Sequence, residues 1–473
     1  RLDLDASFSR QGNIYTGDTQ NTNNYTTLPN GQLAPTSRRV QEALGSETNR
    51  MYRSNYALTH TGRYEGGASS SAYVQHEITR NERMDEGLAG GTEGLFSTGN
   101  FSTAHLKSTT LHGEYNQPGK WGSLDHVITL GLEGVHQSFD DPNSVSQATT
   151  EGGTIAGLAS TGRSSKISAK IYSVFVEDNI ELTPETILTP GVRFDHHSKA
   201  GNNWSPSLNL SHNLTREITL KAGVARAYKA PNLYQLNPNY LLYSRGIGCW
   251  GGHGSCYLQG NPDLKAETSI NKELGIEYTD EAVQAGATLF HNDYRNKIVA
   301  GNEPVALSDL GNHLYRWTNA RKALVEGFEG NLTLPLHSTL KWTTNFTYMR
   351  KSVNKDTGNP LSVIPKYTVN SSLNWQPNEK FDAALNVTYY GKQQSRGVVE
   401  NNKDRYEKLT SHTVSPYGLV GINAGYRFNK NFNARLGINN LFNKQLYRSA
   451  NNASAQTYNE PGRTFYVTLT GTL

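Results

Sequence analysis

Cys249 and Cys256 are the only cysteines in the chain, and the segment between them is rich in glycine. Such a short, flexible span lets two thiols meet, and exported proteins form disulfides in oxidising compartments. We therefore expect a disulfide that closes the tip of a loop. A metal site is the alternative, but it would need more ligands than His253 and two thiols supply.

Catalytic chemistry has little support in the sequence. There is no Gly-x-Ser-x-Gly elbow, and no local spacing joins a nucleophile to a base and an orienting group. We expect a protein that is not an enzyme, with no cofactor and no protein-bound metal.

The composition excludes several classes of protein. Mean hydropathy is −0.62 and hydrophobic residues make up 35% of the 473 residues. No apolar run reaches the roughly 18 residues that a membrane-spanning helix needs. The 26 Tyr, 14 Phe and 6 Trp are too many for a disordered chain. A net charge of +4 does not indicate nucleic-acid binding, and no linker or shift in composition divides the chain.

Alternation of apolar and polar residues is the dominant pattern. In the segment 188–196, Leu188, Val192 and Phe194 fall on one face of an extended strand, and Arg193 and Asp195 fall on the other. The polar residues of such segments are strongly hydrated types. This pattern is typical of a transmembrane β-barrel that has lipid outside and a polar lumen inside.

About eighteen segments show the pattern, an even number as in bacterial single-chain barrels. The predicted strands are 1–10, 51–62, 69–79, 104–114, 125–139, 166–180, 186–196, 204–214, 218–228, 269–279, 282–292, 325–334, 339–349, 362–375, 381–390, 418–428, 433–437 and 463–473.

The connections between these segments alternate between short and long. Short turns are expected at 183–185, 215–217, 336–338, 377–379 and 429–431, and long loops at 11–50, 80–103, 140–165, 229–268 and 391–416. Outer-membrane barrels have short periplasmic turns and long extracellular loops. The sequence therefore predicts an all-β, transmembrane antiparallel β-barrel in the bacterial outer membrane, with one barrel domain over 1–473.

The chain starts directly in a strand pattern, with no initiator Met, signal peptide or N-terminal soluble domain. We expect it to be a trimmed chain or a fragment.

Several motifs resemble those of TonB-dependent outer-membrane receptors. They are ARAYKAPNLY at 225–234, GNPDLKAETS at 260–269 followed by ELGIE at 273–277, NLFNK at 440–444 and PGRT at 461–464. Narrower stretches resemble the catecholate-siderophore branch, the ferric enterobactin receptors: RQGNIYTGDTQN at 10–21, GLAGGTEG at 87–94, RFDHH at 193–197 and YLLYSRGIGC at 240–249.

The resemblance implies a complete protein with a 22-stranded barrel, an N-terminal plug domain and a short segment that contacts TonB. We expect the plug, that segment and the first barrel strands to be absent from this chain. Such barrels usually end in an aromatic residue, whereas this chain ends in Leu473.

The ligand that the resemblance implies is a ferric catecholate siderophore, a compact trianion with three aromatic faces. Arg or Lys would attract its charge and aromatic side chains would contact its rings, and the iron needs no protein ligand. Positive loops would also steer anions inward. The candidate binding residues in the loops are Arg245, Tyr240, Tyr243, Arg80, Arg83, Tyr15, Tyr25 and Trp250.

Structural roles are open for several of these residues. Tyr15, Tyr240 and Tyr243 could be membrane-interface or loop-packing aromatics. Arg80 lies near Glu82 in the sequence and could form a solvated ion pair. Arg245 has no adjacent acid, so we favour it most. His196 and His197 are interpreted as polar rim residues rather than ligands.

The leading functional hypothesis is a TonB-dependent receptor that binds and imports ferric catecholates. The alternatives are a passive, porin-like diffusion channel, a receptor for a different iron complex, and a structural or adhesive surface protein. The expected partners are the siderophore–iron complex, TonB through the missing N-terminal region, outer-membrane lipid and lipopolysaccharide. Phages or bacteriocins are further candidates.

Overall fold

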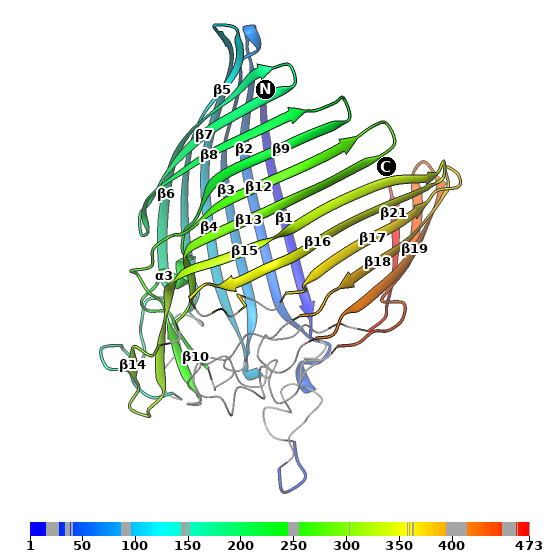
Figure 1. Cartoon of the computed structure of the whole chain (residues 1–473). Helices are drawn as coiled ribbons and strands as arrows, with labels where there is room; N and C mark the ends of the chain where they lie inside the picture. Colours follow the sequence, from blue (N-terminus) through cyan, green and yellow to red (C-terminus); the bar gives the residue numbers. More distant parts are fainter. Residues whose placement is uncertain are drawn as a thin grey trace.

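One antiparallel sheet dominates the computed structural model (Figure 1). Among the described residues it contains eighteen strands, each paired with the next. They are β1 (Leu2–Ile14), β2 (Glu47–Arg63), β3 (Ser69–Glu86), β4 (Phe96–Trp121), β5 (Leu124–Asp140), β6 (Lys166–Thr183), β7 (Thr186–His197), β8 (Gly201–Asn213), β9 (Ile218–Lys229), β12 (Glu267–Thr279), β13 (Gln284–Ala300), β15 (His313–His337), β16 (Leu340–Asn354), β17 (Tyr367–Trp375), β18 (Phe381–Tyr390), β19 (Tyr417–Asn429), β20 (Phe432–Asn439) and β21 (Thr464–Gly471).

The structure describes most of the chain. The described residues are 1–15, 28–33, 38, 41–86, 96–142, 149, 152–244, 255–301, 303–356, 358, 360–361, 364–393, 414–446, 460 and 462–472.

The predicted fold class is confirmed, and each of the eighteen predicted segments corresponds to one of these strands. Several strands are much longer than predicted. The segment 104–114 is part of the 26-residue β4, and 325–334 is part of the 25-residue β15. Most of the predicted loop 80–103 is therefore strand. Hydrophobic alternation is needed only where a strand crosses lipid, whereas the backbone ladder continues beyond that region.

A second, small sheet lies in the long connections at the opposite end from the short turns (Figure 1). It contains β10 (Leu241–Ser244), β11 (Cys256–Gln259) and β14 (Ala306–Leu307), and β11 and β14 both pair with the start of β15. The helix α3 (Leu233–Leu236) precedes it. The sequence predicted a plain loop at 229–268, because four-residue elements are too short to show a period.

The two faces of the large sheet differ as the alternation predicts. Leu132, Val174 and Leu208 share one face, and their side chains are 52%, 57% and 44% exposed. Arg193 lies on the other face, 2.7 Å from Glu133 and 2.8 Å from Asp195. Large apolar side chains that face outward suit contact with lipid, and the charged network suits a hydrated lumen.

The first and last strands of the sheet are each paired on one side. Within the described residues β1 pairs with β2 and β21 with β20, and no ladder joins β1 to β21. The 22 strands implied for a complete protein remain a prediction. In the part of the chain that the structure describes, no helix has the length and apolar character needed to cross a membrane.

The assignment of faces predicts opposite effects for neighbouring substitutions in β8. Leu208→Arg places a charge on the lipid face and should destabilise the folded barrel by about 2–4 kcal/mol. Ser207→Arg, one residue away on the lumen face, should cost far less. Reversible denaturant unfolding in phospholipid measures both changes, and equal losses of stability would contradict the assignment.

Candidate functional site

The extracellular connections form a platform at the mouth of the barrel. We call the segments 152–165, 233–244, 255–264 and 303–316 the loop platform. Its buried centre contains five apolar side chains, namely Ile155, Leu241, Tyr243, Tyr257 and Leu314. These side chains come from loops far apart in the sequence, so their burial fixes the loops relative to one another.

Hydrogen bonds reinforce this packing. The Tyr257 hydroxyl donates to the carbonyl oxygen of Gly153 at 3.0 Å, and the Ser308 hydroxyl donates to that of Gly152 at 2.7 Å. Burial raises the pKa of Tyr257 to about 12, so its hydroxyl remains a donor at neutral pH. Three connections are thereby tied into one unit beside the barrel opening.

Tyr240 and Tyr243 are buried within the loop platform, with exposed fractions of 8% and 6%. The Tyr243 ring lies 4.9 Å from that of Tyr257, and the Tyr240 ring lies 5.6 Å from that of Tyr234. Burial is the main cause that raises the pKa of Tyr240 to about 12. In this arrangement both side chains support the loops rather than present their rings to the opening.

Arg83 lies on the inward face of β3, next to the loop platform. Its guanidinium contacts the carboxylate of Asp141 at 2.9 Å, and both groups act electrostatically on Tyr240. The Asp141 side chain is only 7% exposed, whereas that of Arg83 is 32% exposed. Arg83 is thus a partly accessible cation at the mouth, held in place by a buried carboxylate.

Arg80 has a different environment although it lies only three residues away. Its position shares a face with Val74, which is 47% exposed on the apolar side of the sheet. Arg80 forms an ion pair with Glu82 at 3.3 Å, and its guanidinium lies 4.3 Å from the ring centroid of Tyr52. This geometry matches the alternative that Arg80 forms an ion pair, and the Arg80 side chain lies on the face that points away from the lumen.

The other predicted residues are only partly described. Tyr15 follows β1, and its backbone N–H donates to the carbonyl oxygen of Ser46 at 2.8 Å. Cys256 is disulfide-bonded, and Cys249 is the only other cysteine in the sequence. The predicted residues that lie outside the described residues are Tyr25, Arg245, Cys249 and Trp250.

Sequence reasoning did not identify two arginines of the loop platform. Arg163 donates from Nε to the carbonyl oxygen of Asn239 at 3.2 Å, and burial lowers its pKa. Arg316 donates from Nε to Oε1 of Gln259 at 2.8 Å and is exposed. Neither residue has a recognisable motif around it, so only the folded loops show that they lie at the mouth.

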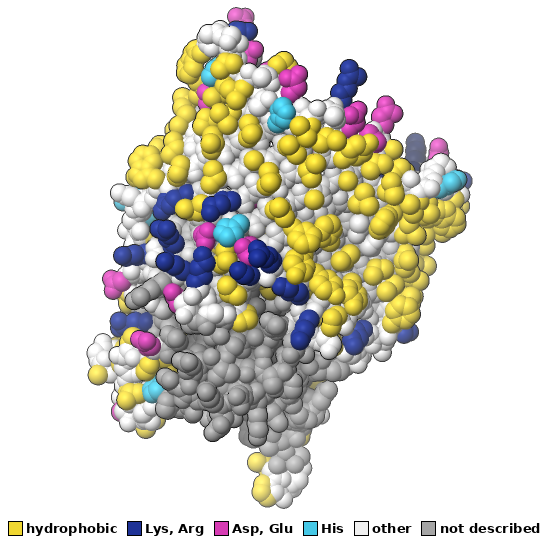
Figure 2. Space-filling view, in the orientation of Figure 1, with side chains coloured by type: hydrophobic (Ala, Val, Ile, Leu, Met, Phe, Trp, Pro, Cys, Tyr) yellow, Lys and Arg dark blue, Asp and Glu magenta, His cyan; other side chains and the backbone are white. Residues whose placement is uncertain are grey.

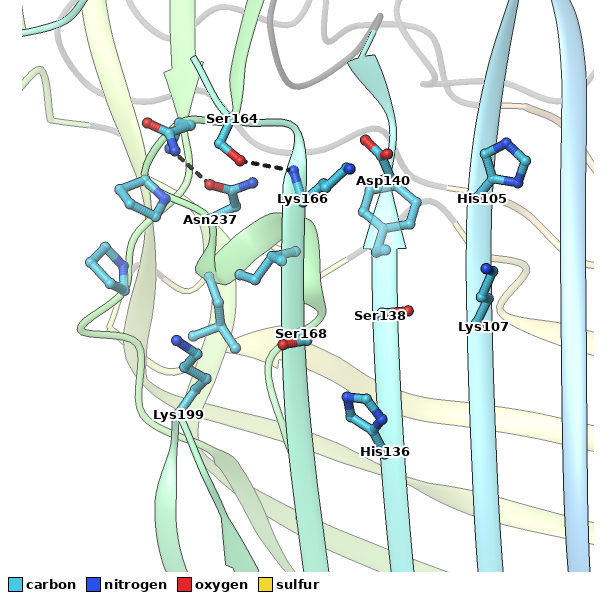
Figure 3. Close-up of a pocket in the computed structure, with 16 residues that line it drawn as sticks. His105, Lys107, His136, Ser138, Asp140, Ser164, Lys166, Ser168, Lys199 and Asn237 are labelled. Carbon is cyan, nitrogen blue, oxygen red and sulfur yellow. Dashed lines mark hydrogen bonds between the residues drawn. The ribbon is translucent and has the colours of Figure 1, made fainter.

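A second basic region lies on the outer flank, in a cavity of about 910 Å³ (Figure 3). Lys107, Lys166 and Lys199 line it, together with His105 and His136. None of the three lysines has an ion-pair partner among the residues that the structure describes. His105, Lys107 and His136 share the outward face with Leu111, whereas Phe139 and Ile167, which also line the cavity, lie on the opposite face of the sheet.

Among the described residues, no group of three or more His, Cys, Asp or Glu could hold a metal ion. The inward side of the mouth instead combines cations and aromatic rings. Trp317 is a further aromatic residue there, and its ring lies 6.1 Å from that of Tyr234. Such a surface can attract an anionic ligand and contact its apolar or aromatic parts.

A substitution at Gly260 tests whether the loop platform behaves as one unit. A Cβ at this position would collide with the backbone carbonyl oxygen of Asn237. Gly260→Ala should therefore loosen the platform while the barrel stays folded, and extracellular loops should be cleaved faster in limited proteolysis. Gly119→Ala is the control, since nothing lies within 4 Å of its added Cβ. Unchanged cleavage in Gly260→Ala would show that the loops are held independently.

Comparisons with known proteins agree with this architecture. The family model described as TonB dependent receptor-like, beta-barrel, matches residues 1–441. The ferric enterobactin receptor of Pseudomonas aeruginosa is 54% identical over 99% of this chain and 63% of its own length. The ferrienterobactin receptor of Escherichia coli K12 is 48% identical over 99% of this chain and 64% of its own length. The chain thus spans less than two thirds of these relatives.

Solved structures give the same result. A mutant of the Pseudomonas aeruginosa ferric enterobactin receptor, in complex with enterobactin, is 53% identical with a TM-score of 0.87, over 99% of this chain and 68% of that one. The siderophore receptor PirA from Acinetobacter baumannii is 41% identical with a TM-score of 0.84, over 99% of this chain and 68% of that one. The predicted resemblance and the outer-membrane location are confirmed. The chain belongs to the TonB-dependent receptor family and forms its β-barrel region.

Proposed function

We propose that this chain is the barrel region of a receptor that binds and imports ferric catecholate siderophores of the enterobactin type. The observation that carries the proposal is the inward mouth of the barrel, where Arg83 lies next to the loop platform and the rings of Tyr234 and Trp317 are only partly buried. A tris-catecholate complex presents negative charge and aromatic faces together. Arginine and aromatic side chains bind such a ligand better than either type alone.

The relatives support this choice of ligand. Relatives that are 54% and 48% identical to the chain are named ferric enterobactin and ferrienterobactin receptors, and a solved relative with the same fold holds enterobactin. A passive diffusion channel would not need a rigid platform with a partly accessible Arg83 held by a buried Asp141 at its mouth. A receptor for another anionic iron complex remains the second candidate, and the choice between ligands depends on the shape of the loops.

The remaining parts of the proposal concern the complete receptor. We propose that it also contains a plug domain and a segment that contacts TonB, and that energy for import reaches the barrel through TonB. The iron complex is the transported ligand and the barrel performs no catalysis. Residues 1–473 then act as one barrel domain whose lumen encloses the plug.

Arg83 and Arg80 provide a matched pair for testing the ligand site. In the complete receptor, Arg83→Gln should weaken binding of ferric enterobactin about tenfold, equivalent to about 1.4 kcal/mol. The reason is that this change removes a partly accessible inward cation, which the carboxylate of Asp141 holds in place. Arg80→Gln removes the same charge from the outward face and should change affinity little.

Quenching of tryptophan fluorescence measures these affinities, with a ferric hydroxamate as the control ligand. Equal effects of the two substitutions would remove Arg83 from the site. Binding that does not distinguish catecholate from hydroxamate would contradict the proposed ligand class.

A further inference from the structure

The middle of β16, β17 and β18 presents no charged side chain to the lumen, within the described segments 343–347, 368–374 and 384–390. Trp375 and Leu385 are 45% and 40% exposed on the outer face, and Figure 2 shows this surface to be apolar where Figure 1 labels the three strands. The alternate residues therefore face inward. We call six of these inward residues the neutral wall: Asn345, Asn370, Ser372, Asn374, Asn386 and Thr388.

Hydrogen bonds within the neutral wall leave amide donors facing the lumen. The Ser372 hydroxyl donates to Oδ1 of Asn386 at 2.9 Å, and the Thr388 hydroxyl donates to Oδ1 of Asn370 at 3.0 Å. Both asparagines are exposed, and within the described residues their Nδ2 groups have no hydrogen-bond partner. An amide N–H can donate to an anionic oxygen without the permanent charge that would hold the anion in place.

Other parts of the lumen wall carry carboxylates. Glu273 on β12 and Glu329 on β15 lie on the inward face, each beside an exposed apolar residue of the outward face. On β5 and β7, Glu133 and Asp195 both contact Arg193, which leaves an excess of one negative charge. Like charges repel strongly in a confined space, so these sides of the lumen disfavour an anion.

The strand β8 offers a second uncharged strip, which includes the inward residues Asn209 and Asn213. It is only one strand wide, because Asp195 faces inward on β7, and Lys221 on β9 forms an ion pair with Glu277 at 2.7 Å. Strands lie about 4.8 Å apart, which is narrower than a complex with three aromatic rings. The neutral wall spans three strands and suits such a complex better.

The two ends of the neutral wall suit the entry and exit of an anion. At the extracellular end, the ring of Tyr390 is partly exposed on the inward face. At the periplasmic end, Lys341, Arg427 and Arg435 lie on the inward face, and Asp382 contacts Arg435 at 2.5 Å. These four charged groups leave an excess of two positive charges, which would attract an anion toward the periplasm.

We propose that the neutral wall is the side of the lumen along which the anionic iron complex moves from the mouth to the periplasm. Its catecholate oxygens would accept hydrogen bonds from successive asparagine amides. Passage requires contacts weak enough to release the solute at each step, and uncharged donors meet this requirement better than arginine does. The inference rests on the proposed import function and adds the route to it.

Carboxylates placed on the neutral wall test the route. In the complete receptor, Asn370→Asp/Asn386→Asp keeps both side-chain shapes and both Oδ1 acceptors but adds two negative charges. The rate of iron-55 enterobactin uptake by cells, at saturating ligand, should fall about tenfold. Affinity, measured by quenching of tryptophan fluorescence, should stay within about twofold of the wild type. That affinity also verifies that the variant is folded.

Asn209→Asp/Asn213→Asp on β8 is the matched control. These asparagines are also exposed and face the lumen, and the substitutions add the same charge. The control should reduce the uptake rate by less than about twofold, because its carboxylates lie away from the proposed route.

Two results would overturn the inference. Uptake at the wild-type rate in Asn370→Asp/Asn386→Asp would show that the complex does not pass along the neutral wall. Equal losses in this variant and the control would show that negative charge anywhere in the lumen slows import. A wild-type receptor that neither binds nor imports ferric enterobactin would give a different pattern, and would overturn the proposed function and this inference with it.

Discussion

The continuous ladder of backbone hydrogen bonds across eighteen strands is the interaction on which the rest of this structure depends. Lipid offers no partners to backbone N–H and C=O groups, so a chain of this composition can cross a membrane only when neighbouring strands satisfy one another. The ladder also fixes the register of each pair. Because side chains alternate along a strand, a fixed register assigns every residue to the lipid face or the lumen face. A slip of one residue would exchange the two sets.

Both proposals follow from this assignment. Arg80 and Arg83 occupy one strand, yet one lies on the outward face and the other pairs with Asp141 at the mouth of the lumen. Inward cations can act on a solute that passes through the barrel, whereas outward cations can act only on lipid or on molecules at its surface. The loop platform adds to the strands a rigid boundary at the mouth, which they could not provide alone, because its buried tyrosines tie three connections together. Rigid support of this kind lowers the entropy cost of binding.

The sequence was sufficient to predict the all-β class and the approximate position of every long strand, because lipid contact imposes alternation on each of them. It was insufficient where that constraint ends. The outer halves of β3 and β4 lie beyond the lipid and lack a clear apolar face, so they were interpreted as a loop that contained Arg80 and Arg83. Tyr240 and Tyr243 were candidates both for ligand contact and for loop packing, and both are buried in the loop platform, because residue type alone does not distinguish packing from binding. Arg163 and Arg316 acquire their positions through contacts between distant loops, which one sequence does not show.

Uptake of radioactive iron by cells tests the central claim most directly. A strain that lacks its own catecholate receptors would express the complete receptor and be supplied with iron-55 bound to enterobactin or to a hydroxamate. The account predicts saturable uptake of the enterobactin complex alone, which stops when TonB is deleted. Uptake that is not saturable, that is equal for both complexes or that continues without TonB would contradict it, because a passive channel would then explain transport.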